Sequence, residues 1–262
     1  MKNLTLEIPT KWAGRPAYFY DSVDSTNIEA KRLADGGAPH GTLVVADMQT
    51  AGRGRRGRSW LSPSGTNIYF TILLRPDFAP NKASMLTLVM AHSVARAIRG
   101  ETGLNAGIKW PNDIVIGGRK ICGILTELSV ESEAIKNVVI GVGVNVHEQD
   151  FASDLSDKAT FLDRECGWRV SRSRLLSDIM WAFEEDYDIF AAEGSLAPLR
   201  SSYNGLLINR DREVCVLDPA GEYWGIARGI TDTGELVVQL SDGSTREVFA
   251  GEVSVRGIYG YV

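Results

Sequence analysis

Glycine and arginine alternate in one segment of the chain, from Gln49 to Trp60, with the sequence QTAGRGRRGRSW. Glycine lets the backbone pass close to a ligand, and arginine neutralises negative charge while it donates several hydrogen bonds. Backbone N–H groups in such a loop can also form an anion-binding nest. The composition suits a carboxylate that reacts with a phosphate. It also fits a solvated loop or an RNA-binding segment, and it lacks the GxxxxGK[ST] pattern of a P-loop.

A lysine, an amide and a carboxylate lie close together in Lys109-Trp110-Pro111-Asn112-Asp113. If a strand ends here, the proline fixes a turn in which the lysine could bind phosphate oxygens and the carboxylate could hold Mg²⁺. An ordinary Asn/Asp turn has the same residues and is the more frequent explanation of this motif taken alone.

Two further segments place a polar group in an apolar strand. Lys120, in GRKICGIL, needs a charged partner or an anionic ligand unless it is a surface lysine at a hairpin end. In Gly141-Val142-Gly143-Val144-Asn145 the glycines permit a close approach to a strand that ends in an amide, or tight packing within a sheet.

A fourth motif, Asp24-Ser25-Thr26-Asn27, lies where a helix is expected to begin. Hydroxyls and amides at this position most often cap the helix, and they can also bind a polar ligand. The spacing of Thr26 and Glu29 is that of a capping box.

The composition narrows the class of protein. Hydrophobic residues make up 44% of the 262 residues and charged residues 23%, as in soluble globular proteins, and the net charge of −5 gives no general attraction to nucleic acid. The three cysteines, Cys122, Cys166 and Cys215, lack the number and spacing of a disulfide framework or a zinc site. No apolar run approaches the roughly 20 residues that span a membrane, and no signal peptide is evident, so we expect a cytoplasmic protein.

The elements that must position these motifs alternate between strands and helices. Hydrophobic periodicity and the placement of glycines predict a first helix ending at Gly36-Gly37, a second ending at Gly100, and a hairpin at Gly117-Gly118-Arg119. The expected strands are 17–20, 42–46, 67–74, 113–116, 120–128 and 138–146, and the expected helices are 26–34, 83–98 and 174–190.

After Asn209 the pattern changes to short alternating segments separated by turn residues. This pattern predicts a small antiparallel β-barrel of about fifty residues. We therefore expect two domains, residues 1–208 and 209–262.

Together, the motifs occur in a specific order: DSTN, QTAGRGRRGRSW, KWPND, GRKICGIL and GVGVN, followed by GIARGI at residues 225–230. In this order the chain resembles the biotin protein ligases, also called biotin–[acetyl-CoA-carboxylase] ligases, over nearly its whole length. The resemblance implies an α+β fold: a mixed β-sheet catalytic domain flanked by helices, related to class II aminoacyl-tRNA synthetases and lipoate ligases, with a small C-terminal SH3-like β-barrel.

The resemblance also implies an activity, in which ATP and biotin form biotinyl-AMP and biotin passes to a lysine of a biotin carboxyl carrier protein or domain. It assigns catalysis to Arg55 and Lys120, and a role in Mg²⁺ binding to Asp113. The implied biotin-binding residues are Ser25, Thr26, Asn27, Gln49, Arg53, Gly54, Arg55 and Lys120. The implied ATP-binding residues are Trp60, Lys109, Asn112, Asp113 and Asn145, and Arg256 would approach the nucleotide from the small domain.

The transcriptional regulators of this family carry a helix-turn-helix domain before the catalytic core. Only about twenty residues precede Asp21, which is too few for such a module, so we do not expect DNA binding. Two alternatives stay open, a lipoate protein ligase and a non-catalytic RNA-binding module. Edge strands of the sheet could pair with a carrier domain or with a second copy of the chain, as a homodimer.

Overall fold

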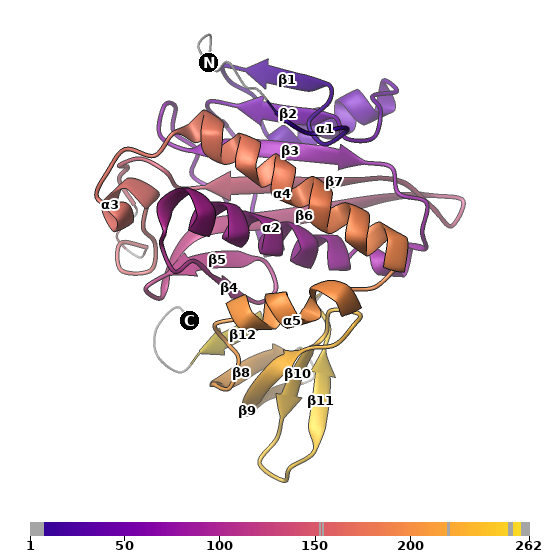
Figure 1. Cartoon of the computed structure of the whole chain (residues 1–262), viewed down its shortest axis with the longest axis vertical. Helices are drawn as coiled ribbons and strands as arrows, with labels where there is room; N and C mark the ends of the chain where they lie inside the picture. The colour runs from indigo at the N-terminus through magenta and orange to yellow at the C-terminus, as the bar shows by residue number, and fades with distance from the viewer. Residues whose placement is uncertain (1–7, 152, 154, 219–220, 251–253, 258–262) are drawn as a thin grey trace.

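A computed structural model describes residues 8–151, 153, 155–218 and 221–250, and the backbone of 254–257. It contains two β-sheets, with helices packed on both faces of the larger one (Figure 1). The strands of the larger sheet are β1 (Ala17–Tyr20), β2 (Leu43–Ala46), β3 (Ile68–Leu74), β4 (Gly107–Lys109), β5 (Asp113–Ile116), β6 (Arg119–Glu131) and β7 (Ala134–Val144). The helices are α1 (Thr26–Asp35), α2 (Met85–Thr102), α3 (Leu162–Cys166), α4 (Arg172–Glu193) and α5 (Ala197–Leu206), with 3₁₀ turns at Arg55–Gly57 and Pro80–Lys82.

The larger sheet has the strand order β1-β2-β3-β7-β6-β5-β4. Only β1 and β2 run parallel, and the other neighbours are antiparallel, so the sheet is mixed as expected. Alternate side chains divide between its two faces. In β2 and β3, for example, Leu43 and Ile72 pack in the main core with α2 and α4, whereas Val44 and Leu73 pack under α1. The face under α1 is therefore distinct from the face that builds the core.

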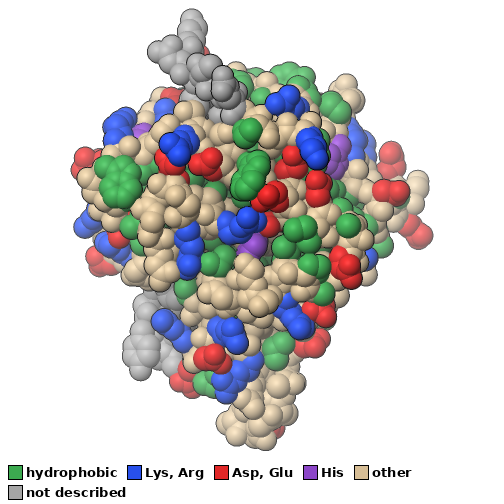
Figure 2. Space-filling model, viewed as in Figure 1, with side chains coloured by type: hydrophobic (Ala, Val, Ile, Leu, Met, Phe, Trp, Pro, Cys, Tyr) green, Lys and Arg blue, Asp and Glu red, His purple; other side chains and the backbone are tan. Residues whose placement is uncertain are grey.

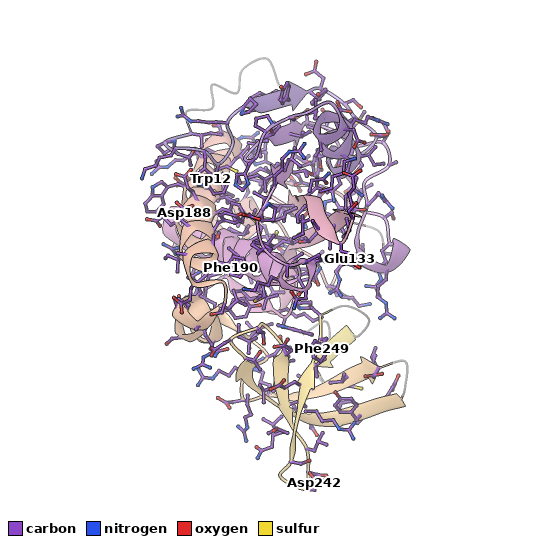
Figure 3. The ribbon with its side chains drawn as sticks, turned by 90° about the vertical axis from the view of Figure 1, so that its right-hand side faces the viewer. Trp12, Glu133, Asp188, Phe190, Asp242 and Phe249 are labelled. Atoms are coloured by element: carbon purple, nitrogen blue, oxygen red, sulfur yellow. The ribbon has the colours of Figure 1, made fainter. Side chains whose placement is uncertain are left out.

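The smaller sheet contains β8 (Glu213–Asp218), β9 (Gly221–Ile230), β10 (Leu236–Gln239), β11 (Thr245–Val248) and β12 (Ser254–Gly257), in the order β11-β10-β9-β8-β12. Its apolar side chains belong to the same continuous hydrophobic cluster as those of the larger sheet. Trp110 strengthens this junction, because its buried indole Nε1 donates to the carbonyl of Gly234, 3.1 Å away, in the turn before β10. Figure 3 shows Phe249 at the junction and Asp242 at the far tip of the small sheet.

Most of the expected elements are confirmed, and two local predictions were wrong. The second helix continues past Gly100 to Thr102, and Gly103 ends it in the left-handed conformation, with φ of 71°. The capping box is also absent: Ser25 is the N-cap, and Thr26 already lies inside the helix. Three elements had no clear periodic signal and were not predicted, namely α3, α5 and β12.

Among the described residues, no helix combines the length and the apolar character needed to cross a bilayer. Acidic and basic side chains alternate over the face in Figure 2, without one large area of a single sign. This distribution agrees with the modest net charge.

Candidate active site

A small pocket opens on the α1 face of the large sheet, between the start of α1, the glycine- and arginine-rich loop of residues 49–60 (the Gly/Arg loop), β6 and β7. Most of the residues singled out in the sequence meet there, although they come from distant parts of the chain. Those that line the pocket are Ser25, Thr26, Asn27, Gln49, Arg53, Gly54, Arg55, Trp60, Asn112 and Lys120.

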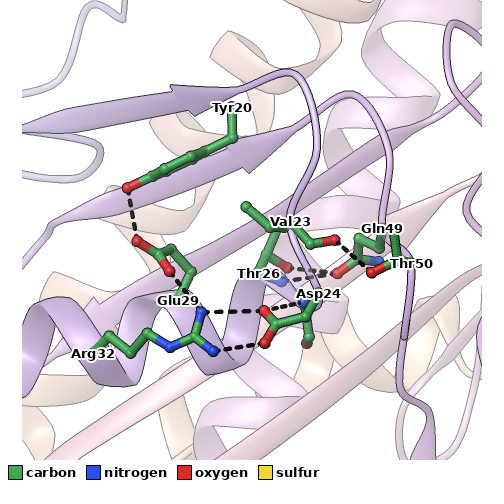
Figure 4. Close-up of polar contacts among 9 residues, drawn as sticks. Tyr20, Val23, Asp24, Thr26, Glu29, Arg32, Gln49 and Thr50 are labelled. Atoms are coloured by element: carbon green, nitrogen blue, oxygen red, sulfur yellow. Dashed lines mark hydrogen bonds and ion pairs between the residues drawn. The ribbon is translucent and has the colours of Figure 1, made fainter.

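One end of the pocket is neutral and polar. The side-chain oxygen of Gln49 accepts from both the N–H and the hydroxyl of Thr26, at 2.9 and 3.1 Å (Figure 4). The amide nitrogen of Gln49 donates to Ser62. The side chain of Ser25, the N-cap residue, accepts no hydrogen bond from the first turn of α1. Gln49 satisfies one of the free N–H groups of this turn, that of Thr26. These contacts fix the direction of the amide at the start of α1.

Asn27 is held in the floor beside this polar end. It is buried, and its Oδ1 accepts from the hydroxyl of Thr71 at 2.7 Å. A Cβ at Gly141 would lie only 2.1 Å from Oδ1, so this strand position must be glycine for Asn27 to approach. At this position the glycine-rich strand permits tight packing of a protein side chain, the second of the two expected explanations.

The opposite end is charged. The ammonium of Lys120 lies 2.6 Å from a carboxylate oxygen of Asp113, and the amide of Asn112 donates to the same oxygen at 3.1 Å. Arg55 donates to Oδ1 of Asn112 at 2.8 Å and to the carbonyl of Ala250. Burial lowers the pKa of Arg55, although the nearby Asp113 opposes the change. The guanidinium stays charged because its ordinary pKa is far above neutrality.

The ring of Trp60 lies across the floor between these ends. A Cβ at Gly143 would come within 2.4 Å of its Nε1, and the ammonium of Lys120 lies 5.2 Å from the ring centroid, a cation–π distance. The buried Nε1–H has no hydrogen-bond acceptor among the described residues. An unpaired buried donor is costly, so the indole is held here by its packing against Gly143 and not by a hydrogen bond of Nε1.

Three expected site residues lie outside the pocket lining. Asp113 reaches it only through Lys120 and Asn112. Lys109 is buried at the end of β4, opposite Asp113 in the strand pairing. Asn145 is buried after β7 and donates to the carbonyl of Thr160 at 3.1 Å, which holds the segment leading to α3. Arg256 lies in β12, and its side chain is outside the described part of the chain.

The residues of the pocket fit Mg²⁺ only if substrate phosphates and water supply most of its ligands. Within the described parts of the chain no group of three or more His, Cys, Asp or Glu side chains could hold a metal ion. Mg²⁺ commonly uses one or two carboxylates and completes its shell with phosphate oxygens and water. Asp113 can supply one such carboxylate beside the cationic end.

Two polar residues that hold Asn27, Thr71 and Glu127, were not predicted from the sequence. Thr71 is a threonine within the buried strand β3, and Glu127 is a carboxylate within the strand-like run 120–128. A polar side chain in a buried strand needs a partner, and this signal could have identified both residues.

Known proteins place the chain in a family. Residues 19–145 match the profile described as "Biotin/lipoate A/B protein ligase family", and residues 211–256 match "Biotin protein ligase C terminal domain". The "Bifunctional ligase/repressor BirA" of Bacillus subtilis is 35% identical over 250 residues, covering 95% of this chain and 76% of the relative. The chain belongs to the biotin protein ligase family. The "Biotin--[acetyl-CoA-carboxylase] ligase" of Paracoccus denitrificans is 33% identical, covering 87% of this chain and 98% of the relative.

A solved biotin protein ligase has the same fold. The structure "Biotin protein ligase from Aquifex aeolicus in complex with biotin and ATP" superposes with a TM-score of 0.79 at 30% identity, covering 92% of this chain and 98% of the other. The mixed sheet with flanking helices and the separate C-terminal sheet are thus the architecture of this family, as the motifs indicated.

Proposed function

We propose that this biotin protein ligase binds biotin in the pocket under α1, converts it with ATP to biotinyl-AMP, and transfers the biotin to a lysine of a biotin carboxyl carrier protein or domain. One observation carries the proposal. A single pocket joins a neutral polar end, at Thr26, Asn27 and Gln49, to a cationic end at Arg55 and Lys120. Biotin has the same polarity, with a ureido ring at one end and a carboxylate at the other.

The first step is electrostatic, because the carboxylate of biotin must meet the α-phosphate of ATP. The carboxylate oxygen forms a bond to phosphorus, and pyrophosphate leaves with the electrons of the broken P–O bond. Lys120 and Arg55 neutralise the charge that gathers there and align the two groups. Their present partners, Asp113 and Asn112, hold both cations at this end before the substrates arrive.

Nucleotide binding is assigned to the residues around the charged end. Trp60 and Asn112 line the pocket there, and Asp113 pairs with Lys120. Lys109 lies opposite Asp113 in the strand pairing, and Asn145 is buried after β7. Mg²⁺, held by Asp113 and the phosphates, would supply further positive charge to the leaving group.

In the second step the neutral amine of the carrier lysine attacks the acyl carbon of biotinyl-AMP, and AMP leaves. The amine must lose a proton as the amide forms. Asp113 or a phosphate oxygen accepts it, since both lie at this end of the pocket. The Gly/Arg loop excludes water meanwhile, which slows hydrolysis of the mixed anhydride.

The acceptor has an open route to the charged end. A second hollow adjoins the pocket and shares Arg55, Ile124 and Leu125 with it. Beyond Ile124 the described strand pairing of β6 continues only with β7, so its other edge faces this hollow. A strand of a carrier domain could add there through main-chain hydrogen bonds. A second copy of the chain could use the same edge, and the homodimer stays a prediction that light scattering after size exclusion would test.

The alternatives are weaker. The C-terminal match is to a domain named for biotin protein ligases. RNA binding through an extended Gly/Arg segment is disfavoured because the loop folds back on itself, with a bridge between Arg53 and Ser59. The expectations of a cytoplasmic location and of no DNA binding remain predictions.

The test is exchange of labelled pyrophosphate into ATP, with biotin, lipoate or no acid added to protein and Mg²⁺. We expect exchange with biotin only, and a loss of about 10²- to 10³-fold for Arg55→Ala. Arg210→Ala, at an exposed arginine of the small domain, is the control. Exchange with lipoate alone, or none with either acid, would overturn the proposal.

A further inference from the structure

Glu127 is a carboxylate in an unusual position for a β-strand. It lies in β6 between Thr126 and Leu128, and its side chain is only 20% exposed. Strand alternation turns it to the α1 face of the sheet, on the same side as Gly123 and Leu125 of the pocket floor. A partly buried carboxylate requires partners that offset its lost hydration.

Those partners come from the two elements that cover the pocket. The amide nitrogen of Asn27 donates to one oxygen of Glu127 at 2.7 Å, and the ammonium of Lys31 donates to the other at 2.8 Å. The guanidinium of Arg53 lies 3.6 Å from the second oxygen. Burial tends to raise the pKa of Glu127, but the bonds from Lys31 and Asn27 outweigh it, and the pKa is lowered. The group is therefore ionised at neutral pH.

An ionised carboxylate can only accept hydrogen bonds, and this decides how the amide of Asn27 is turned. The Nδ2 group gives its hydrogens to Glu127 and to the carbonyl of Leu125, at 2.7 and 3.2 Å. The Oδ1 atom is left beside Thr71 and the bare backbone of Gly141, a residue that lines the pocket. With both hydrogens engaged, Asn27 can offer a ligand only an acceptor.

We propose that Glu127 is a positioning residue for biotin: it fixes Asn27 with Oδ1 toward the ligand, so that the site accepts a hydrogen bond from a ureido N–H. This inference rests on biotin being the substrate, as proposed above. Because Glu127 acts through Asn27, its loss weakens the binding of the acid more than it slows the chemistry at the other end of the pocket.

The test compares Glu127→Gln with Glu131→Gln, a change of the same kind at an exposed position of the same strand. A glutamine can donate to Asn27 and so permits the amide to turn over. We expect the Kd for biotin in calorimetry and the KM in pyrophosphate exchange to rise about 10- to 100-fold, as for loss of a charged hydrogen bond. We expect kcat and the KM for ATP to stay within about threefold, and Glu131→Gln to match the native protein.

Desthiobiotin keeps the ureido group but lacks the thioether ring, so its affinity should fall by the same factor in Glu127→Gln. A fall in kcat with an unchanged KM for biotin would overturn the positioning role. If Glu127→Gln does not fold, Glu127→Ala removes the acceptor of Asn27 altogether, and an unchanged KM for biotin there would count equally against the role. Absence of biotin-dependent exchange in the native protein would instead overturn the proposed function.

Discussion

The indole ring of Trp60 lies against the bare backbone of Gly143, and a Cβ built on this glycine would meet the indole Nε1 at 2.4 Å. Sequence neighbours do not explain this contact, because the two residues come from the Gly/Arg loop and from β7. The contact makes the wall of the pocket depend on a strand position that has no side chain.

Gly143→Ala should therefore push Trp60 away from the floor. We expect the KM for ATP to rise at least about tenfold and the protein to lose about 1–3 kcal/mol of unfolding free energy, since β7 is fully buried here and cannot retreat. Pyrophosphate exchange and chemical denaturation measure the two effects. In Gly100→Ala the new methyl group meets open space on α2, so activity should be unchanged and stability slightly higher. An unaltered KM in Gly143→Ala would refute the role of this contact.

Lys120→Met removes the cation nearest the expected position of the carboxylate and α-phosphate. We expect kcat for biotin-dependent exchange to fall by about 10²- to 10³-fold, because charge stabilisation in an enclosed site is lost. Lys136→Met is the matched control: Lys136 also pairs with a carboxylate, that of Asp35 at 3.0 Å, but on the surface. Surface pairs contribute about 0–1 kcal/mol, so this variant should keep full activity. Equal activity of both variants would exclude Lys120 from the chemistry.

Glu184→Gln should make the free energy of unfolding less dependent on pH in the acidic range. Glu184 of α4 accepts the N–H groups of Lys11, Trp12 and Ala13, at 2.7 to 2.9 Å. Burial alone would raise the pKa of Glu184, but these bonds lower it below its usual 4.5. The unfolded chain therefore takes up the proton first, and the stabilisation is present above about pH 4.5 and is lost as the pH falls through the lower, folded-state pKa.

We expect Glu184→Gln to lower the free energy of unfolding by about 1–3 kcal/mol at pH 7, because the NH₂ of the new amide faces backbone N–H donors and cannot accept from them. The difference from the native protein should shrink below pH 4.5, as measured by urea unfolding across pH. Glu185→Gln changes the next residue, whose carboxylate is 42% exposed, and should have little effect. A difference that grows as the pH falls would contradict this account.

Trp110→Phe removes the hydrogen bond that joins the large sheet to the turn before β10. We expect the free energy of unfolding to fall by about 1–2 kcal/mol and the Tm to fall by a few degrees, on the order of 2–4 °C per kcal/mol. Calorimetry should still show one transition, because the two sheets share a continuous hydrophobic cluster. Trp168→Phe, at a half-exposed tryptophan, should leave the Tm unchanged. Two separate transitions in the native protein would show that the sheets unfold independently, which fits the two expected domains better.

The sequence by itself determined the elements whose signals are local. The turn at Gly117 and Gly118 requires positive φ at both positions, 57° and 77°, which glycine adopts freely, and the hairpin follows from it. Strand alternation and helical periodicity located most of the larger sheet and its main helices. The order of the motifs indicated the family, and most of their residues lie together in one pocket.

Tertiary structure alone decided how these residues act on one another. Thr26 is of a residue type that commonly caps helices, yet its own N–H is satisfied by Gln49, 23 positions later in the chain. Asn27 is turned by a carboxylate 100 positions away, and no local rule reveals such a pair. Gly100 predicts the end of a helix, but the helix continues to Thr102, and Glu101 pairs with Arg174 of α4 at 2.9 Å. Propensity and spacing act over a few residues, whereas the direction of a side chain is set by whatever the completed sheet brings next to it.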